Sequence, residues 1–482
     1  MRNAARSDSI FFRMRSARGD CIRGPTRISG GDVKTRILTL FLSLRTNYWF
    51  LPSIMIFGAF WLAILMLRLD AAFSGTFPEK ISWIMGMGPE GVRQVLALIA
   101  TSMITVAGVA FSITVVALAL ASQQFGPRLL QNFMRDLGNQ LVLGTFTATF
   151  LYCVLILPGV LGAENHQFIP YYSASVGIFL AIGSLIVLVY FIHHIPASIQ
   201  ANHVIGLVQK ELLANVRKFI PERNSREIGY RKIIPAPFHP EAHFFSKGLA
   251  VKAESSGYIQ AFDIEGLVAC AKRNNIFIRL RKKVGDFVIR EESVAWVHGP
   301  ELSAEMTEEV AGKVLTGDSP TPAQDLEFSL NELVEVALRA LSPGINDPKT
   351  ALQCIDCLTE SLAEIVKRGQ WKFLHQDSEG KFRLFAKPLL FEDFIETAFN
   401  EIRQASVRSV AVMIHLLESF EKIGGFAWRE ENRRVLQKHG EMVQRLAQRT
   451  LQEKHDLEEV EDRYWRLLQV LYPSRENGGF KE

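Results

Sequence analysis

Four long apolar segments that carry no charged side chain constrain this chain more than any other feature. Each is close to the roughly 20 residues that an α-helix needs to cross the hydrocarbon core of a bilayer. Buried helices of a soluble domain would not be expected to supply four such segments in one short part of a chain. We therefore predict an α-helical integral membrane domain over residues 37–195, with transmembrane helices at 49–67, 94–121, 140–162 and 172–192.

The positive charges predict how these helices are oriented. Residues 1–47 hold ten Lys or Arg against three Asp. The turn between the second and third helices contains Arg128 and Arg135, whereas the short turn around Glu164 has neither Lys nor Arg. By the positive-inside rule, both termini of this multi-pass protein face the cytoplasm.

Residues 1–36 are rich in Arg, Ser and Gly without apolar periodicity, and we expect a disordered basic tail there. The tail has neither the apolar core nor the small-residue cleavage site of a signal peptide. The net charge of the whole chain is only +4, and the excess lies in this tail, where anionic lipid attracts it. The lipid bilayer is thus an expected partner, and nucleic acid is not.

The second apolar segment carries a stripe of small and hydroxyl side chains. From Val95 to Ala121 it would run about 40 Å as a helix, which exceeds the thickness of the hydrocarbon core. Alternating steps of four and three residues place the small side chains on one face, with Val115 as the one large member. Such a stripe either packs helices closely in lipid or lines a permeation path in an oligomer. Both alternatives stay open for Thr101, Thr105, Gly108, Ser112, Ala119, Ser122 and Gly126.

The chain after the last apolar segment is predicted to form a cytoplasmic α+β portion. Residues 196–245 predict an amphipathic helix and a Pro-rich linker, residues 246–300 a small β-domain, and residues 301–482 a helical domain. The stretch 428–471 is rich in opposite charges, which indicates a long solvent-facing helix or hairpin arm.

Two segments of the β-domain resemble the strands of a barrel-sandwich hybrid, the fold of biotinyl and lipoyl carriers. They are "VKAESSGYIQAF" and "VGDFVIREESVAWV". The Met-Lys-Met turn that holds the prosthetic group in those carriers does not accompany them. A barrel-sandwich-like fold is therefore expected without a prosthetic group.

The stretch "ALSPGINDP" combines a helix stop, two prolines and two polar side chains. Ser342-Pro343-Gly344 ends one helix, Asp347 is the predicted N-cap of the next with Pro348 at its first position, and Gly369 ends that helix. One interpretation is a turn that simply joins two helices. The other is a polar cradle for a ligand or a neighbouring subunit, formed by Asp325, Glu327, Arg339, Asn346 and Asp347.

The sequence lacks the familiar catalytic and metal-binding motifs, which favours a protein that is not an enzyme. There is no Gly-x-Gly-x-x-Gly after a strand, no Gly-Lys-Ser/Thr loop, no Gly-x-Ser-x-Gly and no His-Glu-x-x-His. Cys354 and Cys357 of "CIDC" fall in a helical pattern, which favours a buried helix face over zinc or redox chemistry. His193 and His194 are expected at the membrane surface rather than on a metal. We expect no cofactor and no metal, and the uncharged helices disfavour an ion-coupled pump.

Five segments together resemble a bacterial family of predicted membrane proteins, domain of unknown function 2254. They are "AFSITVVALALASQQFGPRLLQNFMRDLGNQLVLGTFTATFLY", "YFIHHIPASIQ", "SGYIQAFD", "GDFV" and "ALRALSPGINDPKTALQC". The resemblance covers residues 38–472 and implies an inner-membrane protein with a large cytoplasmic portion, without implying an activity.

The resemblance also marks individual residues. One departure is "SPTPAQD", where Pro320 stands at a position at which the family has an arginine, so an anion site that uses this arginine is not expected here. The residues that fall on family motifs are Gln123, Phe125, Pro127, Arg128, Asn132, Arg135, Asp136, Asn139, His193, His194, Gln324, Asp325, Arg339, Ser342, Pro343, Gly344, Asn346 and Asp347.

Two hypotheses from different classes follow. The first is a homo-oligomer whose second helix lies near the symmetry axis and forms a passive, channel-like conduit for ions or small solutes, with the cytoplasmic domains holding or gating it. The second is a membrane-anchored sensor or scaffold that binds a cytosolic ligand or protein through the turn from Ser342 to Pro348. A membrane enzyme is a third class, for which the polar groups near His193 and Asp136 are the place to look. The direction in which Thr105 and Ser112 point distinguishes a helix-packing face from the wall of a conduit, and so tests the first hypothesis.

Overall fold

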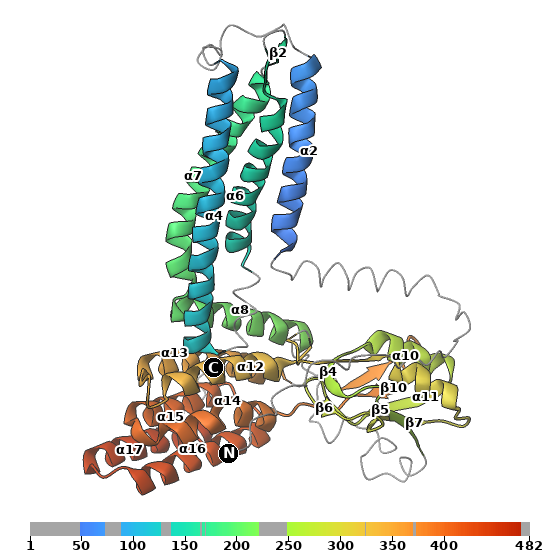
Figure 1. Ribbon diagram of the computed structural model, residues 1–482. Coiled ribbons are helices and arrows are strands. Elements are labelled where there is room, and N and C mark those ends of the chain that lie inside the picture. The colour runs from blue at the N-terminus through green and yellow to red at the C-terminus, as the bar shows by residue number, and fades with distance from the viewer. Residues whose placement is uncertain are drawn as a thin grey trace, which may run out of the picture.

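The protein has a tall bundle of four apolar helices that stands on a broader part formed by the described residues from 201 on (Figure 1). We call these the apolar bundle and, from residue 201 on, the extramembrane part. The predicted tail over residues 1–36 and the Pro-rich linker lie outside the described residues. The computed structural model describes residues 49–72, 88–126, 136–163, 166–168, 170–220, 248–322, 324–369 and 373–473.

Each of the four predicted transmembrane segments contains a helix that is long and apolar enough to cross a membrane, but the third helix ends at Ile156, six residues before the predicted end at residue 162. The third is the centre of the bundle, because it contacts the other three and 50% of its apolar window is buried, against 17–22% in the others. A short turn, η2 (Leu157–Gly159), and a hairpin of β1 (Leu161–Ala163) and β2 (His166–Phe168) close the end of the bundle far from the extramembrane part. The helices are α2 (Phe50–Ala72), α4 (Pro89–Phe125), α6 (Leu137–Ile156) and α7 (Tyr171–Ser198).

A buried carboxylate holds the first of these helices to the last. The N-cap of α7 is Pro170, whose side chain gives no cap hydrogen bond. Asp70 of α2, only 4% exposed, instead accepts hydrogen bonds from the backbone N–H of Tyr172 and of Ser173, both at 2.9 Å, and from the Ser173 hydroxyl at 2.5 Å. Tyr152 of α6 donates to the Ser173 carbonyl at 3.0 Å. An anion at a helix N-terminus is favoured by the unpaired amides and the helix dipole, so this contact ties three helices together.

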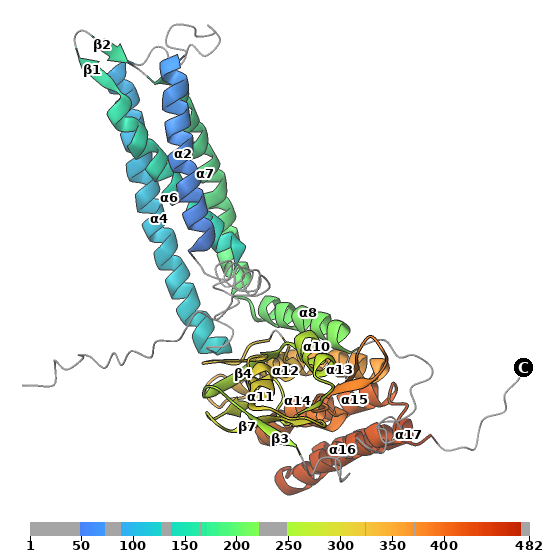
Figure 2. The same cartoon turned by 90° about the vertical axis from the view of Figure 1, so that its right-hand side faces the viewer.

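Two helices run beyond their uncharged segments. α2 continues past Leu67 to Ala72, because Asp70 is satisfied by the amides of α7 instead of by water. α4 has 37 residues and is about 55 Å long, more than the predicted segment from Val95 to Ala121. Figure 2 shows it along the edge of the bundle, reaching down to the extramembrane part.

The larger section of the extramembrane part is a helical unit with one extended apolar core. α8 (Ala201–Phe219) is amphipathic, as expected, and packs its apolar side on the next two helices of the unit. The other helices are α12 (Leu326–Ala340), α13 (Pro348–Arg368), α14 (Phe391–Ala405), the short η5 (Ser406–Arg408), α15 (Val410–Gly424), α16 (Glu430–Thr450) and α17 (Lys454–Leu471).

The charge-rich stretch 428–471 forms the hairpin of α16 and α17, but it is not a solvent-facing arm. Leu436 and Val443 of α16, and Val460 and Leu467 of α17, are fully buried in the core of the helical unit. Their spacing of seven residues puts them on one stripe of each helix. The abundance of charges on the other faces concealed this stripe, so the prediction was wrong for one side of each helix.

The second section is a sheet unit. Its five-stranded sheet has the order β3-β7-β5-β10-β9, and its three-stranded sheet has the order β6-β4-β8. α10 (Ile264–Arg273) and α11 (Ala304–Ala311) belong to the same unit. The strands are β3 (Leu249–Lys252), β4 (Gly257–Phe262), β5 (Phe277–Leu280), β6 (Phe287–Val288), β7 (Ser293–His298), β8 (Val314–Gly317), β9 (Leu374–Gln376) and β10 (Phe382–Phe385).

The small mixed sheets confirm an α+β portion, but they do not confirm a barrel-sandwich fold. Three of the strands, β8, β9 and β10, come from the stretch after residue 301 that was predicted to be helical throughout. β10 pairs in parallel with β5 and antiparallel with β9. Each of the three strands has only three or four residues, too few for an alternating pattern to stand out.

Replacement of Asp70 by Ala tests the tie between α2 and α7. Loss of the carboxylate leaves two buried amides without an acceptor, and we expect a cost of about 2 kcal/mol or more in stability. The measurement is the melting temperature of the detergent-solubilised protein. Asp70→Asn keeps one acceptor oxygen, so its melting temperature should lie between those of the wild type and Asp70→Ala. Arg68→Ala, at an exposed position of the same helix, serves as the control. An Asp70→Ala protein that melts with the wild type would show that the tie is unimportant.

Candidate functional site

The stripe of small residues on α4 points out of the subunit. At 3.6 residues per turn its members lie opposite the side that packs against the other helices. Ser122 is half-buried, and a Cβ added to Gly108 would meet nothing within 4 Å. The exposed members are Thr101, Thr105, Gly108, Ser112 and Ala119.

A different set of small side chains on α4 does the packing. Ala107 and Ala110 are buried in a cluster with Phe146 of α6 and Phe191 of α7, and Ala117 joins them. The stripe therefore does not pack within its own subunit. What it faces is lipid, a neighbouring subunit or a water-filled path.

The hydroxyl groups of the stripe need no outside partner. Thr105 Oγ1 donates to the carbonyl of Thr101 at 2.8 Å, and Ser112 Oγ donates to that of Gly108 at 2.9 Å. Bonds to the carbonyl four residues earlier let a hydroxyl lie in an apolar environment without an unsatisfied donor. The hydroxyl oxygens keep lone pairs that can accept from water or from a passing solute.

The foot of α4 is held by an arginine of the helical unit. Arg339, in the last turn of α12, donates through Nη1 to the carbonyl oxygens of Ser122 at 2.8 Å and Gln123 at 3.1 Å. The last carbonyls of a helix carry partial negative charge, so a guanidinium is well suited to cap them. The Ser122 carbonyl also accepts from the Gly126 N–H at 3.1 Å. Gly126 ends the helix with φ +100°, a backbone angle that favours glycine. Its Cβ position would lie 3.7 Å from both Arg339 Nη1 and Glu335 Oε2.

Apolar packing reinforces this contact. Ala121 is 1% exposed and belongs to the core of the helical unit, together with Val204 and Ile205 of α8 and Leu333 of α12. The helix that bears the stripe thus enters the core of the extramembrane part. A displacement of α12 must be accommodated at the foot of α4.

The turn between α12 and α13 is ordered by its own side chains. Ser342 donates to the carbonyl of Arg339 at 2.7 Å. Asp347 caps α13 and accepts from the Thr350 amide at 3.2 Å and the Thr350 hydroxyl at 2.5 Å, and these bonds lower the pKa of its carboxyl. Asn346 is exposed and has φ 49°, a left-handed angle that asparagine tolerates. The predicted N-cap, the proline after it and the glycine stop at Gly369 are all confirmed.

The predicted polar cradle does not form. Asp325 is the N-cap of α12, whereas Arg339 lies in its last turn, and about 14 residues of helix place the two about 20 Å apart. Asp325 accepts from the amides of Glu327 at 3.0 Å and Phe328 at 3.2 Å. These residues therefore serve opposite ends of one helix and cannot meet at one ligand together with Asn346 and Asp347.

Asp325 and its neighbour Gln324 fasten the sheet unit to the start of α12. Gln324 pairs with the backbone of Phe262 at the end of β4, accepting from its N–H at 3.1 Å and donating to its carbonyl at 3.3 Å. A Cβ on Gly285 would lie 2.3 Å from Asp325 Oδ2, so only glycine fits there. Burial, helped by the charge of Glu327, raises the pKa of Asp325 to about 6.

A third polar group joins α6 to α7 at the end of the bundle that faces the extramembrane part. Asp136 caps α6 by accepting from the Gly138 amide at 3.0 Å, and its other oxygen lies 2.6 Å from His194 Nε2. The Tyr190 hydroxyl lies 3.2 Å from His194 Nδ1. Asp136 and His194 are thus brought together as a clamp, whereas His193 is exposed and takes no part in it. Pro127, Arg128, Asn132 and Arg135 lie outside the described residues, as does the side chain of Phe125.

The cysteine pair lies on a buried face of α13, as predicted. Burial raises the pKa of Cys357 to about 11 and also raises that of Cys354, so both thiols are protonated at neutral pH. A thiolate is the form that binds metals and exchanges disulfides. Within the described part of the chain, no group of three His, Cys, Asp or Glu side chains is placed to hold a metal ion.

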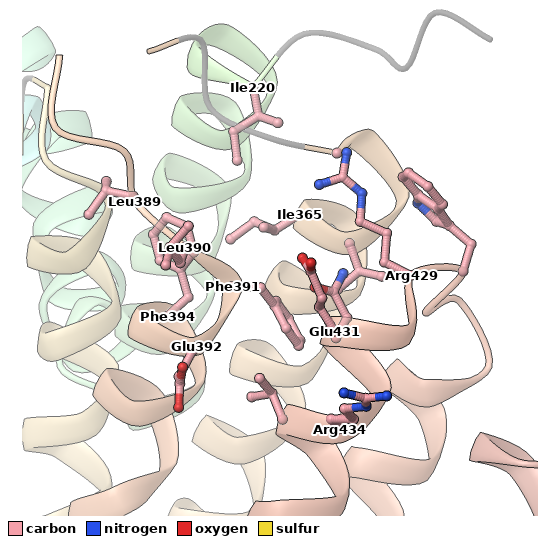
Figure 3. Close-up of a pocket in the computed structure, with 15 residues that line it drawn as sticks. Ile220, Ile365, Leu389, Leu390, Phe391, Glu392, Phe394, Arg429, Glu431 and Arg434 are labelled. Atoms are coloured by element: carbon pink, nitrogen blue, oxygen red, sulfur yellow. The ribbon is translucent and has the colours of Figure 1, made fainter. Parts of the chain in front are cut away.

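A cavity of about 340 Å³ opens where α13 ends and where α14 and α16 begin (Figure 3). Phe391 and Phe394 form part of its wall, and Arg429, Glu431 and Arg434 border it. Positive and negative side chains are mixed, and the guanidinium of Arg434 is paired with Glu430 at 3.2 Å. The lining therefore does not select a ligand of one charge.

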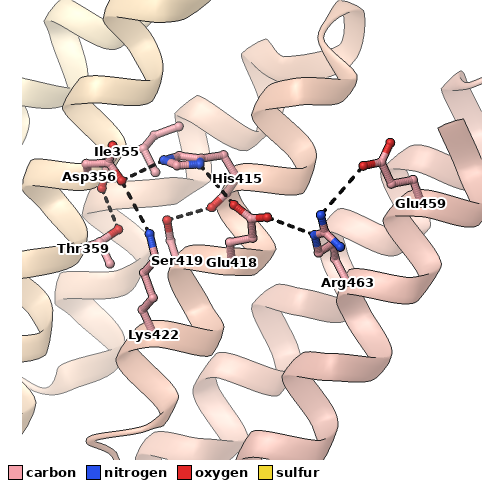
Figure 4. Close-up of polar contacts among 9 residues, drawn as sticks. All are labelled: Ile355, Asp356, Thr359, His415, Glu418, Ser419, Lys422, Glu459 and Arg463. Carbon is pink, nitrogen blue, oxygen red and sulfur yellow. Dashed lines mark hydrogen bonds and ion pairs between the residues drawn. The ribbon is translucent and has the colours of Figure 1, made fainter.

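A chain of polar contacts joins three helices of the helical unit (Figure 4). His415 of α15 has Asp356 of α13 at 2.9 Å on one ring nitrogen and Glu418 at 3.4 Å on the other. Arg463 of α17 continues the chain with a 2.9 Å contact to Glu418 and a 3.9 Å contact to Glu459. These contacts link α13, α15 and α17, and we regard the cluster as structural.

Comparisons with known proteins place this arrangement in a family. The model described as "Predicted membrane protein (DUF2254)" matches residues 45–422. The chain belongs to this family. It is 30% identical over 393 residues to Uncharacterized protein Mb1321c of Mycobacterium bovis and to Uncharacterized protein Rv1290c of Mycobacterium tuberculosis, covering 80% of this chain and 73% of each relative. No solved structure matches the chain.

In this member of the DUF2254 family, two motifs that are far apart in sequence meet in space. The segment that begins at Gln123 and the turn that begins at Ser342 come together through Arg339 and the carbonyl of Ser122, 217 residues apart. Sequence reasoning missed Asp70 and Tyr190. The only signal for Asp70 was its place just after an apolar segment. The only signal for Tyr190 was its place one helical turn before His194.

Arg339→Ala tests the cap on α4. Removal of charge-assisted hydrogen bonds to Ser122 and Gln123 should cost about 1.5–3 kcal/mol locally. We expect amide hydrogen exchange of residues 119–125 to become roughly tenfold faster in the detergent-solubilised protein. Arg339→Lys should give an intermediate rate, and Arg408→Ala, which removes an exposed guanidinium elsewhere in the helical unit, should leave it unchanged. Unaltered exchange in Arg339→Ala would contradict the cap.

The raised pKa of Asp325 predicts a pH-dependent stability. Because the folded protein holds the Asp325 proton more tightly than the unfolded chain, this carboxyl lowers stability as the pH rises from about 4 to about 6. Asp325→Asn keeps a capping oxygen without ionising, so it should melt above the wild type at pH 8, by a difference worth about 3 kcal/mol at most. The difference should be about half as large at pH 5. Asp347→Asn is the control of opposite sign, because the pKa of Asp347 is lowered. Asp347→Asn should melt below the wild type at pH 8. If both variants changed the melting temperature by the same amount at pH 5 and pH 8, the raised pKa of Asp325 would be refuted.

Proposed function

We propose that the protein forms a homo-oligomer in the bacterial inner membrane, in which α4 helices around a common axis line a passive path for ions or small solutes. Both termini and the extramembrane part face the cytoplasm, as the positive charges favour. The observation that carries the proposal is the outward direction of the stripe from Thr101 to Ala119.

The outward face of α4 has the side chains that an oligomer axis needs. Small residues at its centre allow the backbones of neighbouring helices to approach, and exposed Leu98, Val109 and Val116 lie beside them as apolar contact area. Hydroxyl oxygens along the stripe offer lone pairs to a partly hydrated solute.

The absence of a free charge in α4 supports passive movement rather than coupled transport. Between Arg93 and Phe125 the helix contains no Asp, Glu, Lys or Arg. The buried acid of the bundle, Asp70, is occupied by the amides of α7. Proton- and ion-coupled transporters keep an ionisable relay near the membrane midplane, and the described helices offer no such relay in α4.

The foot of α4 supplies the connection that gating requires. The contact of Arg339 with Ser122 and Gln123, and the burial of Ala121 in the helical unit, would carry a movement of α12 into the helix that lines the path. The extramembrane part then holds the assembly and opens or closes it.

A membrane-anchored sensor or scaffold that uses the Ser342–Pro348 turn is the second candidate. It is favoured by Ile345, an apolar side chain 46% exposed at the tip of the turn, next to the exposed Asn346. This alternative predicts no conductance. The proposal that the protein is not an enzyme rests on the missing catalytic sequence motifs, and it takes the contact of Tyr190, His194 and Asp136 as a clamp between α6 and α7.

Ser112→Cys distinguishes a path from a lipid-facing stripe. In planar bilayers we expect the reconstituted protein to conduct, and a cationic methanethiosulfonate reagent to reduce the current of Ser112→Cys several-fold. Ala110→Cys, on the packed face of the same helix, should resist the reagent, as should the parent protein. In all three, Cys21, which lies outside the described residues, is replaced by Ser, and the remaining native cysteines, Cys153, Cys270, Cys354 and Cys357, are buried. No conductance under voltage, tension or added solute would end the conduit proposal.

The same variant tests the oligomer independently. Mild oxidation of Ser112→Cys in membranes should give a disulfide-linked dimer on a denaturing gel, since stripes of neighbouring subunits face one axis. Ala110→Cys should stay monomeric. A Ser112→Cys protein that never cross-links would place the stripe against lipid.

A further inference from the structure

A second cavity, of about 230 Å³, lies where the sheet unit meets the helical unit. The last residues of α8 form one side of it, the N-cap of α12 another, and the turn after β5 a third. The segment after β10 completes the wall. A molecule bound there would touch both units at once.

The charge of its lining is one-sided. Four lysines and one histidine border the cavity, against a single acidic side chain, Asp325. The basic residues are Lys218, Lys282, Lys283, His375 and Lys387. Such an excess of one sign in a recess attracts a ligand of the opposite sign.

Two of the lysines are already neutralised and two are available. Lys282 is paired with Glu292 at 2.5 Å, and Lys283 is paired with Glu327. Lys218 and Lys387 make no ion pair with a carboxylate of the described residues, and the ammonium of Lys218 lies 5.0 Å from the centre of the Phe219 ring. These two ammonium groups are therefore the ones that can neutralise a ligand.

The remaining wall is apolar and partly aromatic. Phe219, Phe262, Leu280 and Val284 line the cavity beside the lysines. Small-molecule sites combine a mostly apolar lining with a few polar groups that fix orientation, and a lysine ammonium is a common partner of phosphate. The size suits a small molecule rather than a chain segment.

We propose that this cavity binds a small phosphate monoester with an apolar or aromatic body, its phosphate between Lys218 and Lys387 and its body against Phe219 and Phe262. The phosphate belongs to a soluble compound or to the headgroup of a phosphatidate lipid. The site of Figure 3 is not an equivalent candidate, because its acids and bases are mixed and Arg434 and Glu392 are already paired.

Phenyl phosphate is the probe for this site. We expect millimolar phenyl phosphate to raise the melting temperature of the full-length, detergent-solubilised protein by several degrees, because a ligand that binds only the folded state stabilises it. Inorganic phosphate and phenol should each give a smaller shift at the same concentration. The double variant Lys218→Gln/Lys387→Gln should lose most of the shift, with at least a fivefold weaker affinity by titration calorimetry.

A matched control removes the same charge elsewhere. Lys349→Gln/Lys454→Gln changes two exposed lysines outside the cavity and should respond like the wild type. Both double variants should melt like the wild type without ligand, since all four lysines are exposed. Equal shifts in the two double variants, or no shift at all with phenyl phosphate and none in the lipid experiment below, would overturn the proposal.

The lipid source is tested in nanodiscs. If nanodiscs with phosphatidate raise the melting temperature over those with phosphatidylcholine, and the Lys218/Lys387 double variant abolishes the difference, the headgroup is the ligand. If only phenyl phosphate acts, the ligand is soluble. Since binding is measured without conductance, failure of this proposal and failure of the conduit are separate outcomes.

Discussion

The cap that Arg339 places on the last turn of α4 is the contact on which the rest of the structure depends. A helix that leaves the membrane ends with carbonyl groups that have lost their partners, and they need either water or a donor. Here a guanidinium from a helix 217 residues later in the chain lies 2.8 Å from the Ser122 carbonyl, which also accepts from the Gly126 N–H at 3.1 Å, and 3.1 Å from the Gln123 carbonyl. The apolar core of the helical unit closes around Ala121 beside it. The apolar bundle and the extramembrane part are therefore held together by the packed end of α4, and not only by the chain that connects α7 to α8.

Local sequence signals predicted the parts of the fold that are decided locally. The length of the four uncharged apolar segments predicted the four helices, because a bilayer requires that length from every spanning segment. Asp347, Pro348 and Gly369 gave both ends of α13, because capping depends on a few adjacent residues. The strand β10 was missed because its parallel partner β5 lies about 100 residues earlier in the chain, and β9 was missed with it because β9 pairs only with β10.

The candidate site was predicted less well, since periodicity identifies a face but not its direction. α4 has two stripes of small residues with the same alternation of three and four, one through Thr105 and Ser112 and one through Ala107, Ala110 and Ala117. Only the packing of α6 and α7 decides that the second is inside. For the same reason Asp325 and Arg339 were grouped as one cradle, although a helix of 15 residues keeps them at its two ends.

That separation places the two ends of α12 at two different contacts. Its N-cap, Asp325, borders the cavity lined by lysines, and its last turn holds the foot of α4. A helix of 15 residues, packed along its length in the core, moves as one piece rather than bending. An anion drawn between Lys218 and Lys387 would shift the balance of charge around Asp325 and Lys283 at one end, and the other end is fixed to the helix that bears the stripe. α12 also packs against α8, α13 and α14, so a movement of α12 would be felt by these helices as well as by α4.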